Sequence, residues 1–230
     1  MNFVVIGATQ GLGYELTKLL LEQGHKVAAG TVEKNPPQAL LDLGDGDNLH
    51  IFPADVTADE QLEAGATACE KFFGGKIDAL CNVAGVLLPG DRVNKIHECD
   101  PAELRLSFEV NTLGVILTGK YFYPAMKKGG KVLSITSEGT GLFNCGSWVP
   151  CYALSKAAAT KASGVFNASV DDVDFYSVHP GRMNTEMGRT TAQIEAVEAA
   201  EGICKIMTGE VQLDRKTWYV DYKGNAMDAG

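Results

Sequence analysis

The fold of this chain is decided by the stretch Phe3-Val4-Val5-Ile6-Gly7-Ala8-Thr9-Gln10-Gly11-Leu12-Gly13. Its first four residues form a short apolar run, which is typical of a strand buried on both faces of a parallel sheet. Glycines follow, and residues 14–23 then have the spacing of a helix, with Gly24 as its expected end. The sequence therefore predicts a strand, a glycine turn and a helix at the start of the chain.

A glycine turn in this position is suited to bind a phosphate. Glycine lets the backbone approach an anion closely, and the helix that follows points free N–H groups and a partial positive charge at it. A tight turn without a ligand remains the alternative for the motif alone. If a pyrophosphate binds, the residues expected around it are Gly7, Thr9, Gln10, Gly11, Leu12 and Gly13.

The rest of the chain alternates apolar runs with helical patterns. Further strands are expected at residues 26–31, 49–52, 77–81, 131–135, 173–178 and 217–220. Helices are expected at residues 58–73, 101–126, 150–165 and 192–207, with a long loop at 86–100. This alternation predicts a doubly wound α/β fold of the Rossmann type, with a parallel sheet covered on both faces. No linker or repeat interrupts the pattern, so we expect residues 1–230 to form a single domain.

Composition narrows the possible partners and the compartment. The chain of 230 residues has 29 acidic and 20 basic side chains, and phosphates would repel that excess of acid. We therefore expect neither nucleic acid nor a membrane as partner, and no apolar stretch approaches the roughly 20 residues that span a bilayer. No signal peptide is recognised. The six cysteines form no C-x-x-C pair, so we expect reduced thiols, no metal site and a cytoplasmic protein.

Five further landmarks follow the glycine turn in order along the chain. They are Asp55-Val56 after the third strand, Asn82-Val83-Ala84-Gly85 after the fourth, Asn111 in the long helix, the Y-x-x-x-K pattern of Tyr152 and Lys156, and Pro180-Gly181 after the sixth strand. With these motifs the chain resembles the short-chain dehydrogenase/reductase family over nearly its whole length. Its tail, residues 218–224, looks like that of the compact C-factor and carbonyl-reductase-like branch. The resemblance implies an NAD(P)-dependent oxidoreductase that transfers a hydride between a nicotinamide cofactor and a small-molecule carbonyl or alcohol.

The resemblance also implies a catalytic set of Ser137, Tyr152, Lys156 and Asn111. Tyr152 and Lys156 are four residues apart and would share one helix face. A nearby ammonium favours the phenolate and lowers the pKa of a tyrosine, so Tyr152 would exchange a proton with the substrate oxygen. Ser137 would hydrogen-bond the same oxygen, although it lies two residues further from Tyr152 than the family pattern suggests. Asn111 would hold a water that connects Lys156 to solvent.

Cofactor contacts are implied at further positions, besides the glycine turn, Tyr152 and Lys156. These are Thr31, Asp55, Val56, Asn82, Ala84, Gly85, Pro180, Gly181 and Thr185. An NAD-selective site of this fold places a carboxylate at the end of the second strand, where it repels a 2′-phosphate. Thr31 is neutral there, which favours NADP over NAD. Glu33 and Lys34 lie just beyond it, and either could turn inward.

The expected substrate pocket is largely apolar. Its walls are residues 138–150, with Phe143 and Trp148, and the segment after Pro180, with Met183 and Met187. A small lid should follow Thr185. His179 is expected to be structural or to form part of the pocket wall.

Small residues in the helix from Pro150 favour a homodimer or homotetramer, with packing on the chain's own sheet as the alternative. A rival function is a dinucleotide-sensing regulator that catalyses nothing. A sugar-nucleotide epimerase is disfavoured, because 230 residues leave no room for its extra substrate region.

Overall fold

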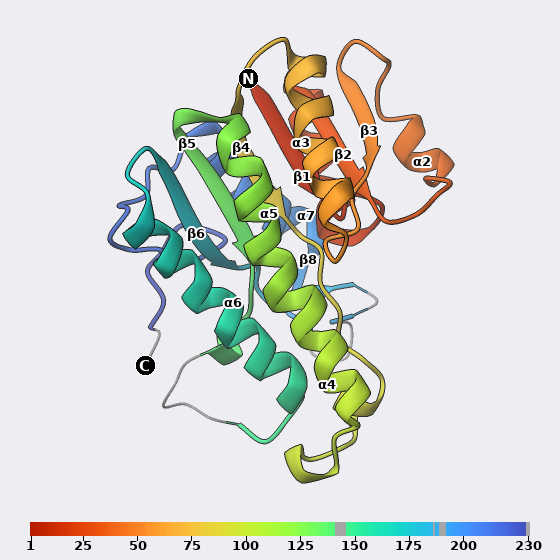
Figure 1. Ribbon diagram of the computed structural model, residues 1–230, viewed down its shortest axis with the longest axis vertical. Helices are drawn as coiled ribbons and strands as arrows, with labels where there is room; N and C mark the ends of the chain where they lie inside the picture. The colour runs from red at the N-terminus through yellow and green to blue at the C-terminus, as the bar shows by residue number, and fades with distance from the viewer. Residues whose placement is uncertain (141–145, 186, 189–191, 229–230) are drawn as a thin grey trace.

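Seven parallel strands form the central sheet, in the order β3-β2-β1-β4-β5-β6-β9 (Figure 1). The computed structural model describes residues 1–140, 146–185, 187–188 and 192–228. The strands are β1 (Asn2–Ile6), β2 (Lys26–Thr31), β3 (Leu49–Pro53), β4 (Ile77–Asn82), β5 (Met126–Ile135), β6 (Val173–His179) and β9 (Tyr219–Asp221). The strand order reverses between β1 and β4, where a doubly wound sheet opens a crevice at its carboxyl ends. The predicted doubly wound fold is confirmed.

Helices cover both faces of the sheet. The α-helices are α1 (Gly11–Glu22), α2 (Gln38–Leu41), α3 (Asp59–Phe73), α4 (Pro101–Phe108), α5 (Gly114–Phe122), α6 (Pro150–Ser169) and α7 (Ala196–Thr208). Short turns of helix are η1 (Gly90–Arg92), η2 (Ile96–Glu98), η3 (Glu109–Leu113), η4 (Tyr123–Ala125) and η5 (Glu138–Thr140), and a small second sheet pairs β7 (Met183–Asn184) with β8 (Ile194–Glu195). Helices α1 and α7 pack together on one face, whereas α3, α5 and α6 lie on the other (Figure 1).

Two apolar cores fill the spaces between sheet and helices. On one face Leu16 and Leu20 of α1 meet Ile203 of α7 against the strands. On the other, Leu62 of α3 and Phe122 of α5 are fully buried against the sheet. Alternate residues of each strand thus enter opposite cores, which explains why the strands read as continuous apolar runs. Among the described residues, no helix has the length and apolar character needed to cross a bilayer.

Several element boundaries differ from the sequence expectation. The long helix predicted at 101–126 is divided, because a π-turn occupies Glu109–Leu113 and the α-helix ends before Pro124. β5 begins at Met126 instead of 131, since residues 127–130 continue the strand through a shift in register against β4. Their sequence, Lys-Lys-Gly-Gly, resembles a turn and gave no strand pattern. α2 was not predicted, and α7 begins four residues later than expected.

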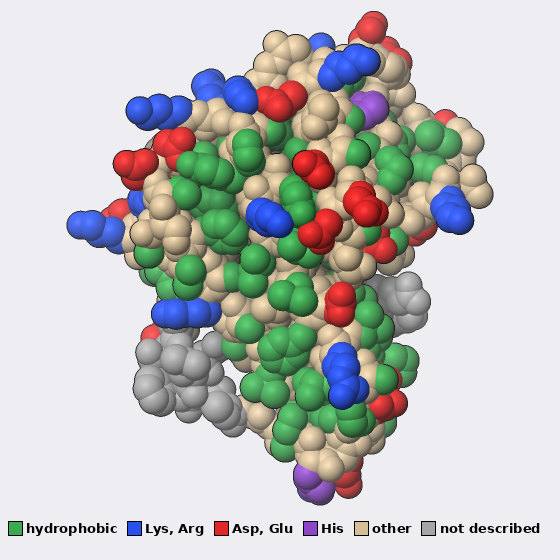
Figure 2. All heavy atoms as spheres, in the orientation of Figure 1, with side chains coloured by type: hydrophobic (Ala, Val, Ile, Leu, Met, Phe, Trp, Pro, Cys, Tyr) green, Lys and Arg blue, Asp and Glu red, His purple; other side chains and the backbone are tan. Residues whose placement is uncertain are grey.

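The face formed by α4, α5 and α6 carries many exposed apolar side chains (Figure 2). Leu106, Leu113 and Ile116 lie along the rod that α4, η3 and α5 form, and Leu154 and Val165 lie on α6. Each of these side chains is at least 36% exposed, so they do not belong to either core.

Candidate active site

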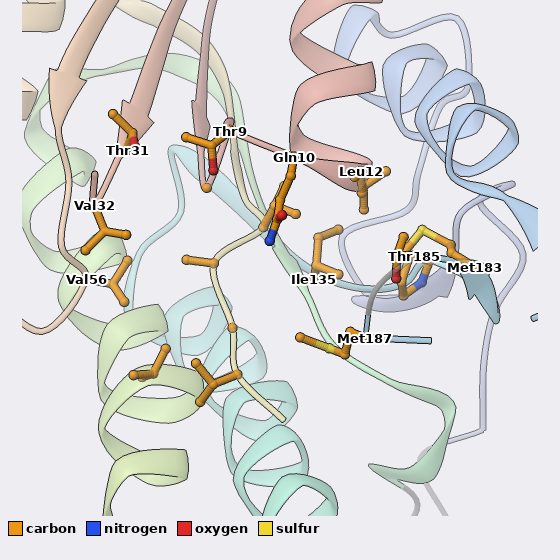
Figure 3. A pocket seen from close by; sticks show the side chains of 18 of the residues that line it. Thr9, Gln10, Leu12, Thr31, Val32, Val56, Ile135, Met183, Thr185 and Met187 are labelled. Atoms are coloured by element: carbon orange, nitrogen blue, oxygen red, sulfur yellow. The ribbon is translucent and has the colours of Figure 1, made fainter. Parts of the chain in front are cut away.

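A cavity of about 630 Å³ opens at the carboxyl ends of the strands, where the strand order reverses (Figure 3). Most of the residues predicted to bind a cofactor line its wall. They are Gly7, Thr9, Gln10, Gly11, Leu12, Thr31, Asp55, Val56, Ala84, Gly85, Tyr152, Lys156, Pro180 and Thr185. The tertiary structure therefore joins segments from β1, β2, β3, β4 and α6 in one site, as the parallel topology requires.

The glycine turn is shaped by close contacts with its neighbours. Gly7 has a φ of +84°, and a Cβ there would lie 2.9 Å from the backbone nitrogen of Ala84. A Cβ on Gly13 would lie 2.0 Å from the carbonyl oxygen of Gly7. The missing side chain of Gly13 thus lets the first turn of α1 pack against the backbone of Gly7. Gly13 itself is not among the residues that line the cavity. Gln10 precedes α1 without capping it through its side chain, so the first N–H groups of the helix are left for an anion.

Tyr152 and Lys156 project from α6 into the same cavity. Lys156 is 3% exposed, and its Nζ donates a 2.7 Å hydrogen bond to the carbonyl oxygen of Ile135 at the end of β5. Its Nζ lies 5.7 Å from the centroid of the Tyr152 ring. The start of α6 is held by Asp91, whose two carboxylate oxygens each accept a 2.8 Å bond, from the backbone N–H groups of Cys151 and Tyr152.

Burial controls the ionisation of both side chains. It raises the pKa of Tyr152 to about 12, and it lowers the pKa of Lys156 to about 8. The expectation that Lys156 lowers the pKa of Tyr152 is wrong for the protein without cofactor. The physical reason is that burial removes water from the phenol, which disfavours its charged form.

Asn111 lies in the π-turn and is fully buried. Its Oδ1 accepts a 2.8 Å bond from the N–H of Val86, and its Nδ2 donates to the carbonyl of Val86 and to Ser155 Oγ. A Cβ placed on Gly85 would meet Lys156 Nζ at 3.0 Å and Asn111 Oδ1 at 3.1 Å. Asn111 and Lys156 therefore both lie close to Gly85, although Asn111, unlike the other two, does not line the cavity.

Ser137 and Thr136 differ in where their hydroxyl groups lie. Ser137 is not among the lining residues; its hydroxyl accepts from the N–H of Gly139, and its carbonyl accepts from the Tyr219 hydroxyl. Thr136 lines the cavity and is buried, and its hydroxyl has no hydrogen-bond partner in the part of the chain that the structure describes. Three hydroxyl residues, Ser134, Thr136 and Ser137, occur at the end of β5, and the family resemblance pointed to Ser137. The structure adds Thr136 as a second candidate, since its hydroxyl lies at the cavity wall.

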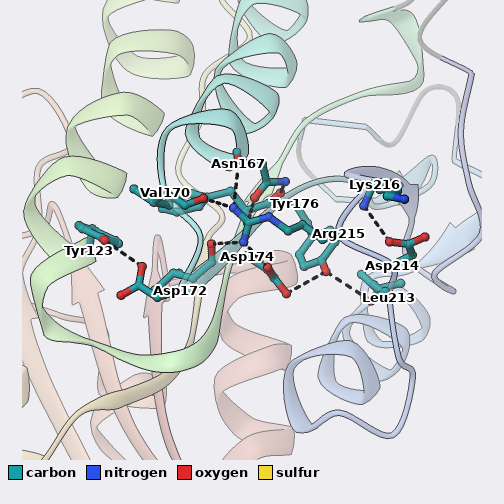
Figure 4. A network of polar contacts seen from close by, with 12 residues as sticks. Tyr123, Asn167, Val170, Asp172, Asp174, Tyr176, Leu213, Asp214, Arg215 and Lys216 are labelled. Carbon is teal, nitrogen blue, oxygen red and sulfur yellow. Dashed lines mark hydrogen bonds and ion pairs between the residues drawn. The ribbon is translucent and has the colours of Figure 1, made fainter.

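An arginine holds the segment that precedes β9 and Tyr219 (Figure 4). Arg215 donates to Asp174 Oδ1 at 2.6 Å and to the carbonyl oxygens of Val173, Asn167 and Val170. These acceptors belong to β6 and to the end of α6. Arg215 thereby attaches the segment before β9 to the start of β6 and to the end of α6.

Other predicted residues shape the site from behind. Asn82 accepts from the N–H of Ala84 and donates to Thr118, which fixes the turn after β4. Gly181 has a φ of +83°, and a Cβ there would lie 2.6 Å from Ile194 Cδ1. His179 Nδ1 accepts from the N–H of Glu138, and burial lowers its pKa, which agrees with a structural role.

The two ends of the cavity, near β2 and near β7, have different linings. At the end of β2 the lining residues include Thr31 and Glu33 but not Lys34, and the Thr31 hydroxyl donates to Glu33 Oε2 at 3.2 Å. At the other end Met183 and Met187 line the wall, as expected. Trp148 is 56% exposed and is not a lining residue, and Phe143 lies outside the described residues. Arg92 donates a 2.7 Å bond to the carbonyl of Met187, so the loop after β4 contacts the segment expected to form a lid.

Comparisons with known proteins agree with this geometry. The family model for the short chain dehydrogenases matches residues 2–196. A 1-hydroxy-2-glutathionyl-2-methyl-3-butene dehydrogenase of Rhodococcus is 30% identical over 211 residues, which are 88% of each chain. The carbonyl reductase Sniffer of D. melanogaster has the same fold, with a TM-score of 0.88, 20% identity and 99% of each chain covered. An NADPH-bound carbonyl reductase from chicken fatty liver gives a TM-score of 0.84 at 23% identity, over 99% of this chain and 98% of that one. The chain belongs to the short-chain dehydrogenase family and is an NAD(P)-dependent oxidoreductase.

Proposed function

We propose that the protein reduces the carbonyl group of an apolar small molecule, or oxidises the corresponding alcohol, with Tyr152 as proton donor or acceptor. The observation that carries this proposal is that Tyr152 and Lys156 line the same cavity as the glycine turn. A bound nicotinamide supplies or accepts the hydride. Tyr152 then donates its phenolic proton to the carbonyl oxygen, and Lys156 beside its ring stabilises the phenolate that remains.

The remaining polar groups would position these two residues. Asn111 holds the backbone of Val86 next to Lys156, and we propose that it carries the water that reconnects Lys156 with solvent. Ser137 is proposed to hydrogen-bond the substrate oxygen, as the family pattern implies. Thr136 is a second candidate, because its buried hydroxyl lines the cavity and has no bond to any described residue. Turnover of the variants Ser137→Ala and Thr136→Val, each with cofactor affinity measured, distinguishes the two.

An apolar substrate is supported by the lining at the nicotinamide end, where Met183 and Met187 face the cavity (Figure 3). Two of the proteins with the same fold are described as carbonyl reductases, which favours the carbonyl-reductase-like branch. A dinucleotide sensor without turnover is the rival. It has no need of a tyrosine and a buried lysine side by side, and oxidation of NAD(P)H by a panel of aldehydes, ketones and quinones tests it.

For the cofactor we propose NADP or NAD, with Glu33 as the residue that limits NADP binding. A neutral Thr31 and the NADP bound in neighbours of the same fold support NADP. Glu33 opposes it, because a carboxylate on the cavity wall repels a 2′-phosphate and accepts from a 2′-hydroxyl. Lys34 is exposed and gives no compensating charge on that wall.

The decisive experiment is Tyr152→Phe. Removing the hydroxyl should leave cofactor affinity nearly unchanged and reduce turnover by at least about 10²-fold, the usual scale for a lost general acid. Tyr121→Phe is the matched control, because that hydroxyl lies on the surface and bonds to Asp59. Turnover of Tyr152→Phe within a few-fold of the parent would refute the assignment, whereas unchanged turnover of Tyr121→Phe is expected.

We also propose a homo-oligomer in the cytoplasm, with the apolar face of α4, α5 and α6 as its contact surface (Figure 2). The small residues of α6 support a helix–helix contact between subunits less than the sequence suggested, because they pack within the chain itself. Ala159 and Ala162 are buried, and Gly164 packs under Trp218. The exposed Leu113 and Val165 carry the argument instead. Light scattering at micromolar concentration should give a dimer or tetramer mass, and Leu113→Glu should shift it to the monomer.

A further inference from the structure

Beside the start of α6, three potential metal ligands from distant parts of the chain come together. They are Asp91 in η1, Cys99 directly after η2, and Cys151 in the first turn of α6. One carboxylate oxygen and the two Sγ atoms all lie within 4.8 Å of one another. Asp91 and Cys151 are each 1% exposed, whereas Cys99 is half-buried and keeps a path to solvent.

A second observation points to a cation at this place. Asp91 is a buried carboxylate that forms no ion pair with any lysine, arginine or histidine of the described segments. Its partners include the two N–H groups at the start of α6 and the thiol of Cys151, which supply only partial positive charge. Burying a carboxylate without a counter-charge is costly, and a metal ion would supply that charge.

We propose that Asp91, Cys99 and Cys151 bind a thiophilic divalent cation of the Zn²⁺ type, with water as the fourth ligand. Zinc accepts sulfur and carboxylate oxygen in a tetrahedron, in which neighbouring ligand atoms are roughly 3.5–3.8 Å apart. The three ligand atoms already lie within 4.8 Å of one another, so an approach of roughly 1 Å would bring them to that spacing. Both thiols lose their protons to solvent as the metal binds. The sequence expectation of no metal site rested on the missing C-x-x-C pair, and it could not detect ligands that are 8 and 52 residues apart.

The position of this site couples it to the active site. Cys151 directly precedes Tyr152, and Asp91 accepts a bond from the N–H of each. A metal that draws on the Asp91 oxygens and on Cys151 Sγ changes how the first turn of α6 is held, and Tyr152 moves with that turn. Metal binding should therefore lower turnover; this consequence, unlike the binding itself, rests on the proposed role of Tyr152.

Binding can be measured without any enzymatic assay by using Co²⁺ as the probe, with a phosphine reductant to keep the thiols reduced. The wild-type protein should give a thiolate-to-cobalt charge-transfer band and visible bands of tetrahedral Co²⁺, saturating at one equivalent. Zn²⁺ should abolish them, because it binds such ligands more tightly. Cys99→Ser and Cys151→Ser should both lose the bands. Cys204→Ser is the control, since that thiol lies on α7 next to Gln23 and should leave them intact.

Activity then tests the coupling separately. Zn²⁺ should lower the turnover of wild-type protein but not that of Cys99→Ser, whose turnover without metal should equal that of the wild type. Absence of the cobalt bands in wild-type protein, or their persistence in both Cys99→Ser and Cys151→Ser, would overturn the metal site. Bands without inhibition by Zn²⁺ would overturn only the coupling. A protein that binds Co²⁺ but reduces no carbonyl would contradict the proposed function and leave the metal site standing.

Discussion

Replacing Lys156 by methionine should make the stability of the cofactor-free protein less dependent on pH. Lys156 is 3% exposed, and burial lowers its pKa from 10.5 to about 8. The difference between these two pKa values corresponds to about 3 kcal/mol. Below pH 8 the charged lysine destabilises the folded chain by this amount. Between pH 8 and 10.5 the unfolded chain binds more protons than the folded one, so the stability of the wild type rises with pH in this window.

Urea unfolding at pH 7.0 and at pH 9.5 measures the effect. The free energy of unfolding of the wild type should rise by about 2 kcal/mol from pH 7.0 to pH 9.5 through the titration of Lys156. This rise should be missing in Lys156→Met. The absolute stabilities are less informative, because the variant also loses the bond to the carbonyl of Ile135, which costs about 1–3 kcal/mol if that oxygen stays unpaired. Measurements stay below pH 10, since the raised pKa of Tyr152 acts in the opposite direction above it.

The comparison isolates Lys156, because the other titrating groups are shared by the two proteins. Parallel pH profiles in wild type and Lys156→Met would refute the claim that a charged, buried lysine destabilises the fold. The same variant should lose turnover at every pH. Together these results would show that the active site contains a charge that the fold alone does not favour.

Three further predictions test the glycine turn, the cofactor choice and the C-terminal segment. Gly13→Ala should push α1 from the turn, because its Cβ would lie 2.0 Å from the Gly7 carbonyl oxygen. The free energy of unfolding in urea should fall by about 1–3 kcal/mol, and cofactor affinity should fall as well. The control Gly46→Ala has open space around the new Cβ and should be neutral. Glu33→Gln should raise the affinity for NADPH relative to NADH about tenfold by calorimetry, about 1.4 kcal/mol, and an unchanged ratio would exclude Glu33 as the discriminating residue. Arg215→Ala should lower the free energy of unfolding by about 2 kcal/mol. Arg215→Lys should restore only part of this stability, because an ammonium cannot reach all four acceptors. Equal stability of Arg215→Ala and wild type would contradict this prediction.

The sequence alone was sufficient for the fold class and for most of the cavity wall. The apolar run at residues 3–6, the glycines after it and the alternation of strands and helices are local patterns, and each is set by backbone geometry within a few residues. Because parallel strands end at one edge of the sheet, motifs that follow the strands had to meet there. Tyr152 and Lys156 were predicted from the family resemblance, and their spacing of four residues agrees with a shared helix face and a shared cavity.

The tertiary structure decided which groups actually touch. No local pattern tells that Asp91 holds the first turn of α6, or that Cys151 approaches Asp91 and Cys99, because these contacts join segments more than 50 residues apart. The fold also decided where the two neighbouring hydroxyl residues lie: Thr136 lines the cavity, whereas Ser137 does not and its carbonyl is bonded to Tyr219. The pKa of Tyr152 likewise depended on burial, a property of the packed chain: the sequence placed a lysine nearby, and the fold removed the water from both side chains.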